Sequence, residues 1–225
     1  MKKQTSQRNP VLLVHGIFDT GRVFERMVPY LTQRGWVVYD FDLTPNNGNE
    51  SLDKLAQQIA NYVECNFPRE QPLDLVGFSM GGIVSRYYVQ RLGGISRVQR
   101  FITISAPHRG TWIAYSHQGV GCVQMRPDSA FLQDLNRDVL MLKQLNFTSM
   151  WTPYDLMIVP ANSSQMPLGR EVIIPALVHG WMITDTRCLA AVADALAEPV
   201  QHISEDRQFE HTPHFRKSPQ SNGNT

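Results

Sequence analysis

The ten residues LDLVGFSMGG, Leu73 to Gly82, decide how this chain folds. A mostly apolar run ends at Gly77, and a single hydroxyl, that of Ser79, follows between glycines. Gly77 and Gly81 flank Ser79 at two-residue spacing, which is the pattern G-x-S-x-G. This pattern predicts a sharp turn from a strand into a helix, in which the serine backbone is strained and the flanking positions have no room for a β-carbon. The turn would lift the Ser79 hydroxyl clear of the sheet, at the N-terminus of the helix.

Strand-like and helix-like segments alternate along the rest of the chain. Apolar runs rich in Val, Ile and Leu predict strands at residues 11–14, 36–43, 73–76, 98–105, 147–151 and 171–178. Helical spacing of apolar residues predicts helices at 22–33, 51–64, 80–92 and 184–197, with Ser51 as an N-cap. We therefore expect an α/β protein with a mostly parallel sheet of about six strands and helices on both faces. We assign residues 1–198 to one domain, 108–145 to a cover over the site, and 199–225 to a disordered tail.

Bulk composition excludes several classes of protein. The chain has 225 residues, of which 42% are hydrophobic and 18% charged, with a formal net charge of +1. This near-neutral balance gives no electrostatic case for a nucleic-acid partner. No apolar run reaches the length of a signal-peptide core or a membrane span, so we expect a cytoplasmic monomer that makes at most transient contact with a lipid surface. The three cysteines lack metal-site spacing, which predicts free, buried thiols.

A serine hydroxyl at such a turn needs a base and a carboxylate that orients the base. In this architecture the expected chain order is Ser, then Asp or Glu, then His, each just after a strand. Among the seven histidines, His179 follows a late strand-like run and precedes the last helix. Asp155 follows the run FTSMW and lies 24 residues before it. We predict Ser79 as nucleophile, Asp155 as acid and His179 as base.

The other site residues come from two further segments. The loop HGIFDTG, which begins at His15, would supply one oxyanion donor, the Ile17 N–H, and the Met80 N–H the other. For substrate binding we predict four side chains, one from this loop and three from the cover: Phe18, Trp112, Ile113 and Met125.

These residues resemble those of the α/β-hydrolase superfamily, and within it the small bacterial lipases of the triacylglycerol-lipase type. The resemblance covers roughly residues 10 to 197 and rests on NPVLLVHGIF, LVGFSMGG, ISAPHRGT and the segments around Asp155 and His179. It implies a three-layer α/β-hydrolase fold and an enzyme that cleaves carboxylic esters of acyl lipids. It implies no cofactor, and since no carboxylate cluster lies near His179 we expect no metal.

Two other classes of function stay open. A thioesterase or an acyltransferase would use the same three side chains on a different bond or acceptor. A ligand-binding protein on the same fold would have no reason to keep Ser79, Asp155 and His179 together, so we rank it last.

Overall fold

The computed structural model describes residues 8–200, and a six-stranded parallel sheet forms its centre. The strands lie in the order β2-β1-β3-β4-β5-β6, and each is parallel to its neighbours. They are β1 (Val11–Val14), β2 (Val38–Phe41), β3 (Leu73–Phe78), β4 (Val98–Ile104), β5 (Asn146–Trp151) and β6 (Arg170–Ile173). This confirms the predicted parallel sheet of about six strands.

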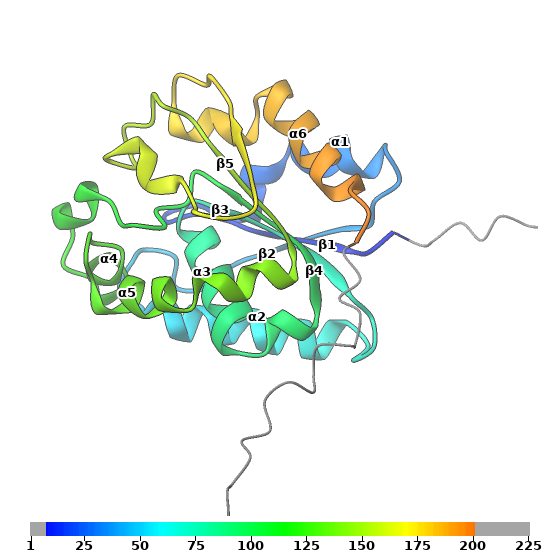
Figure 1. Cartoon of the computed structure of the whole chain (residues 1–225), viewed down its shortest axis with the longest axis horizontal. Coiled ribbons are helices and arrows are strands. Elements are labelled where there is room, and N and C mark those ends of the chain that lie inside the picture. The colour runs from blue at the N-terminus through cyan, green and yellow to red at the C-terminus, as the bar shows by residue number, and fades with distance from the viewer. Residues whose placement is uncertain (1–7, 201–225) are drawn as a thin grey trace, which may run out of the picture.

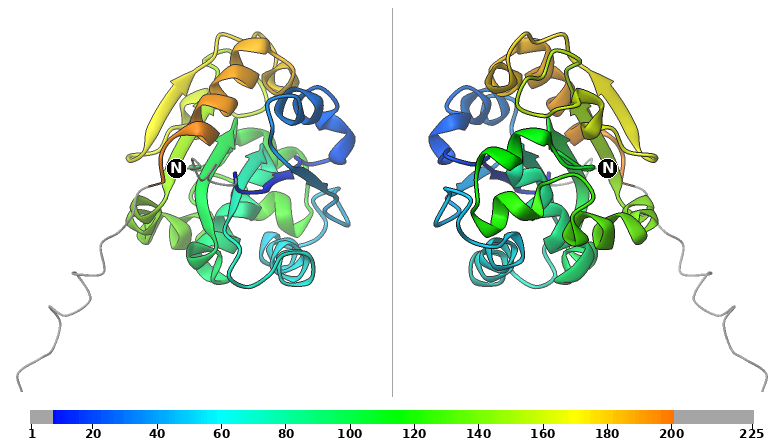
Figure 2. Two further views of the ribbon diagram at one scale, coloured as in Figure 1. Left: turned by 90° about the vertical axis from the view of Figure 1, so that its right-hand side faces the viewer. Right: turned by 90° about the vertical axis from the view of Figure 1, so that its left-hand side faces the viewer.

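Helices cover both faces of the sheet and make three layers. The helices α1 (Met27–Thr32) and α6 (Thr186–Ala197) lie on one face, and α2 (Leu52–Asn66) and α3 (Met80–Arg91) lie on the other (Figure 1). Figure 2 shows the twisted sheet between these two groups. Two short helices, α4 (Val120–Gln124) and α5 (Ala130–Arg137), lie on the side of α3. Short 3-10 helices complete the described part of the chain: η1 (Gly21–Phe24), η2 (Gly94–Ser96), η3 (Trp112–Ser116), η4 (Val139–Gln144), η5 (Ala161–Ser164) and η6 (His179–Ile183).

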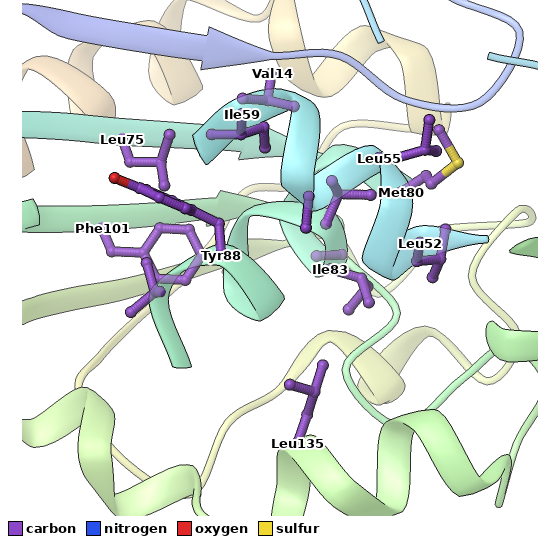
Figure 3. Close-up of a cluster of buried hydrophobic side chains, with 14 of the residues drawn as sticks. Val14, Leu52, Leu55, Ile59, Leu75, Met80, Ile83, Tyr88, Phe101 and Leu135 are labelled. Atoms are coloured by element: carbon purple, nitrogen blue, oxygen red, sulfur yellow. The ribbon is translucent and has the colours of Figure 1, made fainter. Parts of the chain in front are cut away.

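The core is divided by the sheet into two apolar clusters. Along β1, Leu12 and Val14 belong to the cluster under α2 and α3, whereas Val11 and Leu13 belong to the one under α1 and α6. Successive side chains of a strand point to opposite faces, so a strand covered on both sides is apolar at every position. In the first cluster the apolar side chains of α2 pack beside those of α3 (Figure 3).

Several predicted boundaries differ from the observed ones. The last strand, β6, ends at Ile173 and not at residue 178, because Pro175 has no N–H to donate to a sheet. His179 therefore follows a loop, and not a strand directly as predicted. The predicted helix at 22–33 is divided into η1 and α1. Ser51 occupies the N-cap of α2, but its hydroxyl makes no capping hydrogen bond.

The predicted cover, residues 108–145, is hydrogen-bonded to the body at several places, two of which show how it is held. Near its start the Gly121 N–H donates to the Gly48 carbonyl at 3.0 Å. Farther along, Arg86 and Gln90 of α3 donate to the Leu135 carbonyl in the last turn of α5, at 2.8 and 3.0 Å. A cation at a helix C-terminus is favourably placed, because the free carbonyls there carry partial negative charge.

Two further predictions concern the C-terminal tail and the absence of a membrane span. Of the tail predicted for 199–225, residues 201–225 lie outside the described residues. Within residues 8–200, no helix combines the length and the apolar character needed to cross a membrane.

The prediction that all three cysteines are buried is wrong for one of them. Cys65 is exposed on α2, whereas Cys122 and Cys188 are buried. Burial raises the pKa of the Cys188 thiol to about 12, which leaves almost no reactive thiolate at neutral pH.

We expect Cys65 to react first with an aromatic disulfide reagent in the native protein at pH 8. Cys122 and Cys188 should react at a comparable rate only after unfolding in denaturant. Absorbance of the released thiolate measures the number of thiols and the rate. The Cys65→Ser variant should lose the fast phase, and a fast phase that persists in this variant would contradict the assignment.

Candidate active site

Ser79 lies at the turn between β3 and α3, in the strained conformation that the sequence predicts. Its backbone has φ 53° and ψ −125°, a region that side-chain-bearing residues rarely adopt. The turn is held by its N–H, which donates to the Ile104 carbonyl of β4 at 2.8 Å. Ser79 is also the N-cap of α3, so its hydroxyl stands at the positive end of that helix.

The glycines beside Ser79 are there because backbone passes very close to them. A β-carbon on Gly77 would stand 2.6 Å from the Gly82 Cα, and one on Gly81 would meet the carbonyl oxygens of Val14 and His15. Gly82 has a different reason, because its β-carbon would stand 2.5 Å from the Ala106 side chain after β4. The first two are required by the turn, and the third by the close packing of α3 on the sheet.

Asp155 and His179 meet at the same edge of the sheet, after β5 and β6. The His179 Nδ1 lies 2.8 Å from Asp155 Oδ2, and the centroid of the His179 ring lies 4.9 Å from that of Phe78, the residue before the serine, with the two rings tilted. Because a carboxylate can only accept, an imidazole proton lies on Nδ1, and in the neutral ring the lone pair is then on Nε2. Within the described residues, no hydrogen bond joins His179 to the Ser79 hydroxyl.

The Asp155 carboxylate is held in place by its other oxygen. Asp155 Oδ1 accepts hydrogen bonds from the N–H groups of Met157 and Ile158, both at 2.9 Å. Burial raises the pKa of Asp155, but the hydrogen bond and charge of His179 and the two backbone donors outweigh it, so its pKa lies below the usual range. Asp155 is thus ionised at neutral pH and can hold one tautomer of the imidazole.

The two predicted oxyanion donors, Ile17 and Met80, follow β1 and β3, which are neighbours in the sheet. Val14 pairs with Gly77, so both loops leave the sheet at the same level. Neither the Ile17 N–H nor the Met80 N–H has a hydrogen-bond partner among the described residues. His15 shapes the first loop, since its Nε2 accepts from the Leu43 N–H at 2.9 Å and its Nδ1 lies 2.8 Å from the Gly16 carbonyl.

An apolar cavity of about 70 Å³ opens beside Ser79. Of the four predicted substrate-binding side chains, Phe18, Ile113 and Met125 line it. Trp112 does not line it, because its ring is 59% exposed and stacks on Tyr115 at 5.4 Å. The remaining lining residues are Ile17, Pro107, Thr111, Ala114, His117, Cys122, Met157 and Ile158.

Other histidines and carboxylates that could have served as base or acid make contacts away from Ser79. His108 is fully buried under the cover, where burial and the nearby charges of Arg86 and Arg109 hold its pKa well below its usual range. Asp134 and Asp138 both pair with Arg91, at 2.8 and 2.7 Å. Asp185 caps α6 by accepting from the Arg187 N–H. These contacts agree with the predicted choice of Asp155 and His179, whose catalytic roles stay a prediction.

Three residues near the site were not predicted from the sequence. His117, from the cover, lines the cavity and packs on the Phe18 ring at 5.5 Å. Cys122 lies on the cavity wall. Asp19, in the loop HGIFDTG, lies beside Ser79 and is the one that its motif could have revealed, since it follows the predicted oxyanion donor by two residues.

No group of three or more His, Cys, Asp or Glu side chains within residues 8–200 is arranged to hold a metal ion.

Comparison with known proteins gives similar sequences among thioesterases and lipases. Human lysosomal thioesterase PPT2 is 33% identical over 109 residues, which are 46% of this chain and 35% of that protein. A triacylglycerol lipase of Pseudarthrobacter phenanthrenivorans is 30% identical over 116 residues, 48% of this chain and 35% of that protein. The match with each thus spans about a third of the relative's length.

Solved structures agree on the fold. Aspergillus fumigatus lipase B superposes with a TM-score of 0.73 at 16% identity, over 86% of this chain and 53% of that one. Mature Bacillus licheniformis lipase BlEst2 gives 0.69 at 14% identity, over 85% and 93%. The three-layer α/β-hydrolase fold that the sequence resemblance implies is confirmed.

The family itself is shown by the sequence around the turn. The model of the palmitoyl protein thioesterase family matches residues 10–131, more than half of the chain, and includes the loop after β1, the Ser79 turn and most of the cover. A likeness in fold alone does not define a family, so the family is assigned from this sequence match. The chain belongs to the palmitoyl protein thioesterase family of α/β-hydrolases.

Proposed function

We propose that this chain is a serine hydrolase that cleaves carboxylic esters of acyl lipids through an acyl-enzyme on Ser79. The observation that carries the proposal is the strained Ser79 at the head of α3, at the same sheet edge as the 2.8 Å His179–Asp155 pair. Strain of this kind persists only where the surrounding structure imposes it, and it clusters at active sites. The family match and the lipase relatives support the same class of reaction.

The proposed mechanism assigns one task to each group. The Ser79 Oγ attacks the carbonyl carbon while His179 Nε2 takes its proton, and Asp155 stabilises the resulting imidazolium. The Ile17 and Met80 N–H groups donate to the oxyanion. The tetrahedral intermediate collapses as His179 returns the proton to the leaving oxygen. Water, activated by the same imidazole, then releases the acid and frees Ser79.

Apolar surface beside Ser79 supports an acyl substrate. The cavity is lined almost entirely by apolar atoms, and at about 70 Å³ it is far smaller than the roughly 300 Å³ of common ligand pockets, so it would take only the first carbons of an acyl chain. Exposed apolar side chains lie on loops that follow the same strand ends: Phe18, Trp112, Leu156 and Trp181. A longer chain would cross these side chains, and they would also make the transient lipid contact.

Thioester cleavage is the second candidate, and the family match favours it. The matched model is named for a protein thioesterase, and the human relative is a lysosomal thioesterase. The same nucleophile, base and oxyanion donors would act on a thioester, whose leaving thiolate needs less help from the proton on His179.

A matched pair of substrates tests both candidates. We expect butyryl esters and butyryl thioesters of one common leaving skeleton to be hydrolysed, and a fluorophosphonate probe to label the protein on Ser79. Initial rates give kcat/KM for each bond, and their ratio decides between esterase and thioesterase. If the folded protein cleaves neither bond and takes up no probe, the proposal is wrong.

A further inference from the structure

The Asp19 carboxylate lies at the catalytic centre, although the mechanism above gives it no task. A β-carbon built on Gly16 would stand 3.0 Å from Ser79 Cβ and 3.1 Å from Asp19 Oδ2, so both groups border the same point. The third neighbour of this point, at 3.5 Å, is the ring of Phe78, which also contacts the ring of His179. Asp19 is thus a neighbour of the nucleophile and of the base, and not a surface carboxylate.

The backbone around Asp19 is held in place, but within residues 8–200 no group donates a hydrogen bond to its carboxylate. Phe18 adopts φ 61°, which turns the chain back, and its N–H donates to the Asn46 carbonyl at 2.8 Å. The Asn46 side chain in turn donates to the Asp19 carbonyl. The half-buried carboxylate accepts no hydrogen bond from any described residue. Burial raises its pKa, and the nearby His15 and His179 act in the opposite direction.

The Asp19 side chain is partly exposed, so solvent can reach its carboxylate; a bound molecule that covers it would have to supply a donor or a cation, because burying a charge is costly unless it is paired. Asp155 shows the contrast, since both of its oxygens accept hydrogen bonds from the protein. Near Ser79, therefore, Asp19 offers acceptor atoms that no described protein group uses, and a bound molecule could use them.

The position of Asp19 indicates which part of a substrate it would meet. The apolar cavity takes the acyl side, and neither Asp19 nor His179 lines it. The leaving group has to lie by His179, which gives it a proton. We propose, on the basis of the proposed hydrolase function, that Asp19 recognises the leaving group and favours those with a cation or a hydrogen-bond donor close to the scissile bond over anionic ones.

Three butyryl esters with leaving groups of similar size test this inference. They are butyrylcholine, its uncharged isostere 3,3-dimethylbutyl butyrate, and the anionic 2-sulfoethyl butyrate. In Asp19→Asn the side chain keeps its size and loses its charge. We expect the ratio of kcat/KM for the cationic ester to that for the anionic ester to fall about tenfold, and kcat/KM for the uncharged ester to change by less than about threefold.

Two further variants separate this effect from structural damage. Asp19→Ala should lower the ratio as Asp19→Asn does, and Asp19→Glu should keep most of the preference. Glu25→Gln removes one exposed carboxylate from the segment after this loop and should leave the ratio unchanged. Fluorophosphonate labelling of each variant reports whether the Ser79 turn is still formed.

Two results would overturn the inference. A ratio that stays within about threefold of the wild-type value in Asp19→Asn would exclude recognition of charge, and an equal loss on all three esters would indicate a structural role. Either result leaves the proposed hydrolase intact. If the wild-type protein cleaves none of the esters and takes up no probe, the proposed function fails, and this inference fails with it.

Discussion

Replacing Ser79 by Ala should lower kcat for acyl esters by about four to six orders of magnitude, with the fold unchanged. Alanine has no nucleophile, so His179 and the oxyanion donors can only assist the attack of water. Because Ala keeps the β-carbon, the backbone strain at φ 53° and the hydrogen bond to Ile104 are expected to persist. Single-turnover and steady-state assays measure the loss, and thermal unfolding checks the fold.

Ser96→Ala is a matched control for this variant. Ser96 lies in η2, is exposed, and donates only to the Gly93 carbonyl. We expect its kcat to stay within about twofold of wild type. Near-wild-type ester cleavage by Ser79→Ala, together with loss of fluorophosphonate labelling, would show that the probe reports on Ser79 but that the reaction does not use it.

Replacing Gly81 by Ala should be the most destabilising of the glycine substitutions at the turn, lowering the free energy of unfolding by more than about 4 kcal/mol. The new β-carbon would overlap the carbonyl oxygens of Val14 and His15, which are backbone atoms at and just after the end of strand β1. A side chain could rotate away, but β1 is hydrogen-bonded on both sides and cannot move without disturbing β2 and β3. Urea unfolding followed by tryptophan fluorescence measures the difference.

Gly180→Ala is the control for the glycine effect. Gly180 is at the same edge of the sheet, yet a β-carbon there would meet no atom within 4 Å. Its free energy of unfolding should stay within about 0.5 kcal/mol of wild type. If Gly81→Ala proves as stable as Gly180→Ala, then α3 moves away from β1 more easily than the contacts indicate.

Two kinds of sequence pattern predicted the site, namely the spacing of residues within one short segment and the order of segments along the chain. The spacing of Gly77, Ser79 and Gly81 predicts the turn, since the clash it avoids arises within a few residues. The chain order of Ser79, Asp155 and His179 predicts which carboxylate and imidazole meet, because parallel strands bring all their carboxyl ends to one edge of the sheet. That Asp155 and His179 do meet is observed, and their roles in catalysis are for the experiments to decide.

Predictions that depended on contacts between distant segments were less accurate. The sequence predicts burial for Cys65 as for Cys188, yet only Cys188 of these two lies in the core. Trp112 looks like a pocket residue by composition, but the turn of η3 directs its ring outward onto Tyr115. The apolar run at 171–178 predicts a strand that continues past the observed end of β6, because the run includes Pro175, which ends the strand.

The sequence by itself determined the α/β class and the turn at Ser79, because these rest on apolar periodicity and on glycine spacing within short segments. Its motifs also resemble those of the α/β-hydrolase superfamily, whereas the palmitoyl protein thioesterase family was shown by the match over residues 10–131. Only the tertiary structure decided what surrounds the serine: the small cavity under the cover, the His117 ring against Phe18, and the Asp19 carboxylate beside Gly16. These features come from loops after different strands, and their approach depends on how the whole sheet twists and how its helices pack. No pattern of neighbouring residues carries that information.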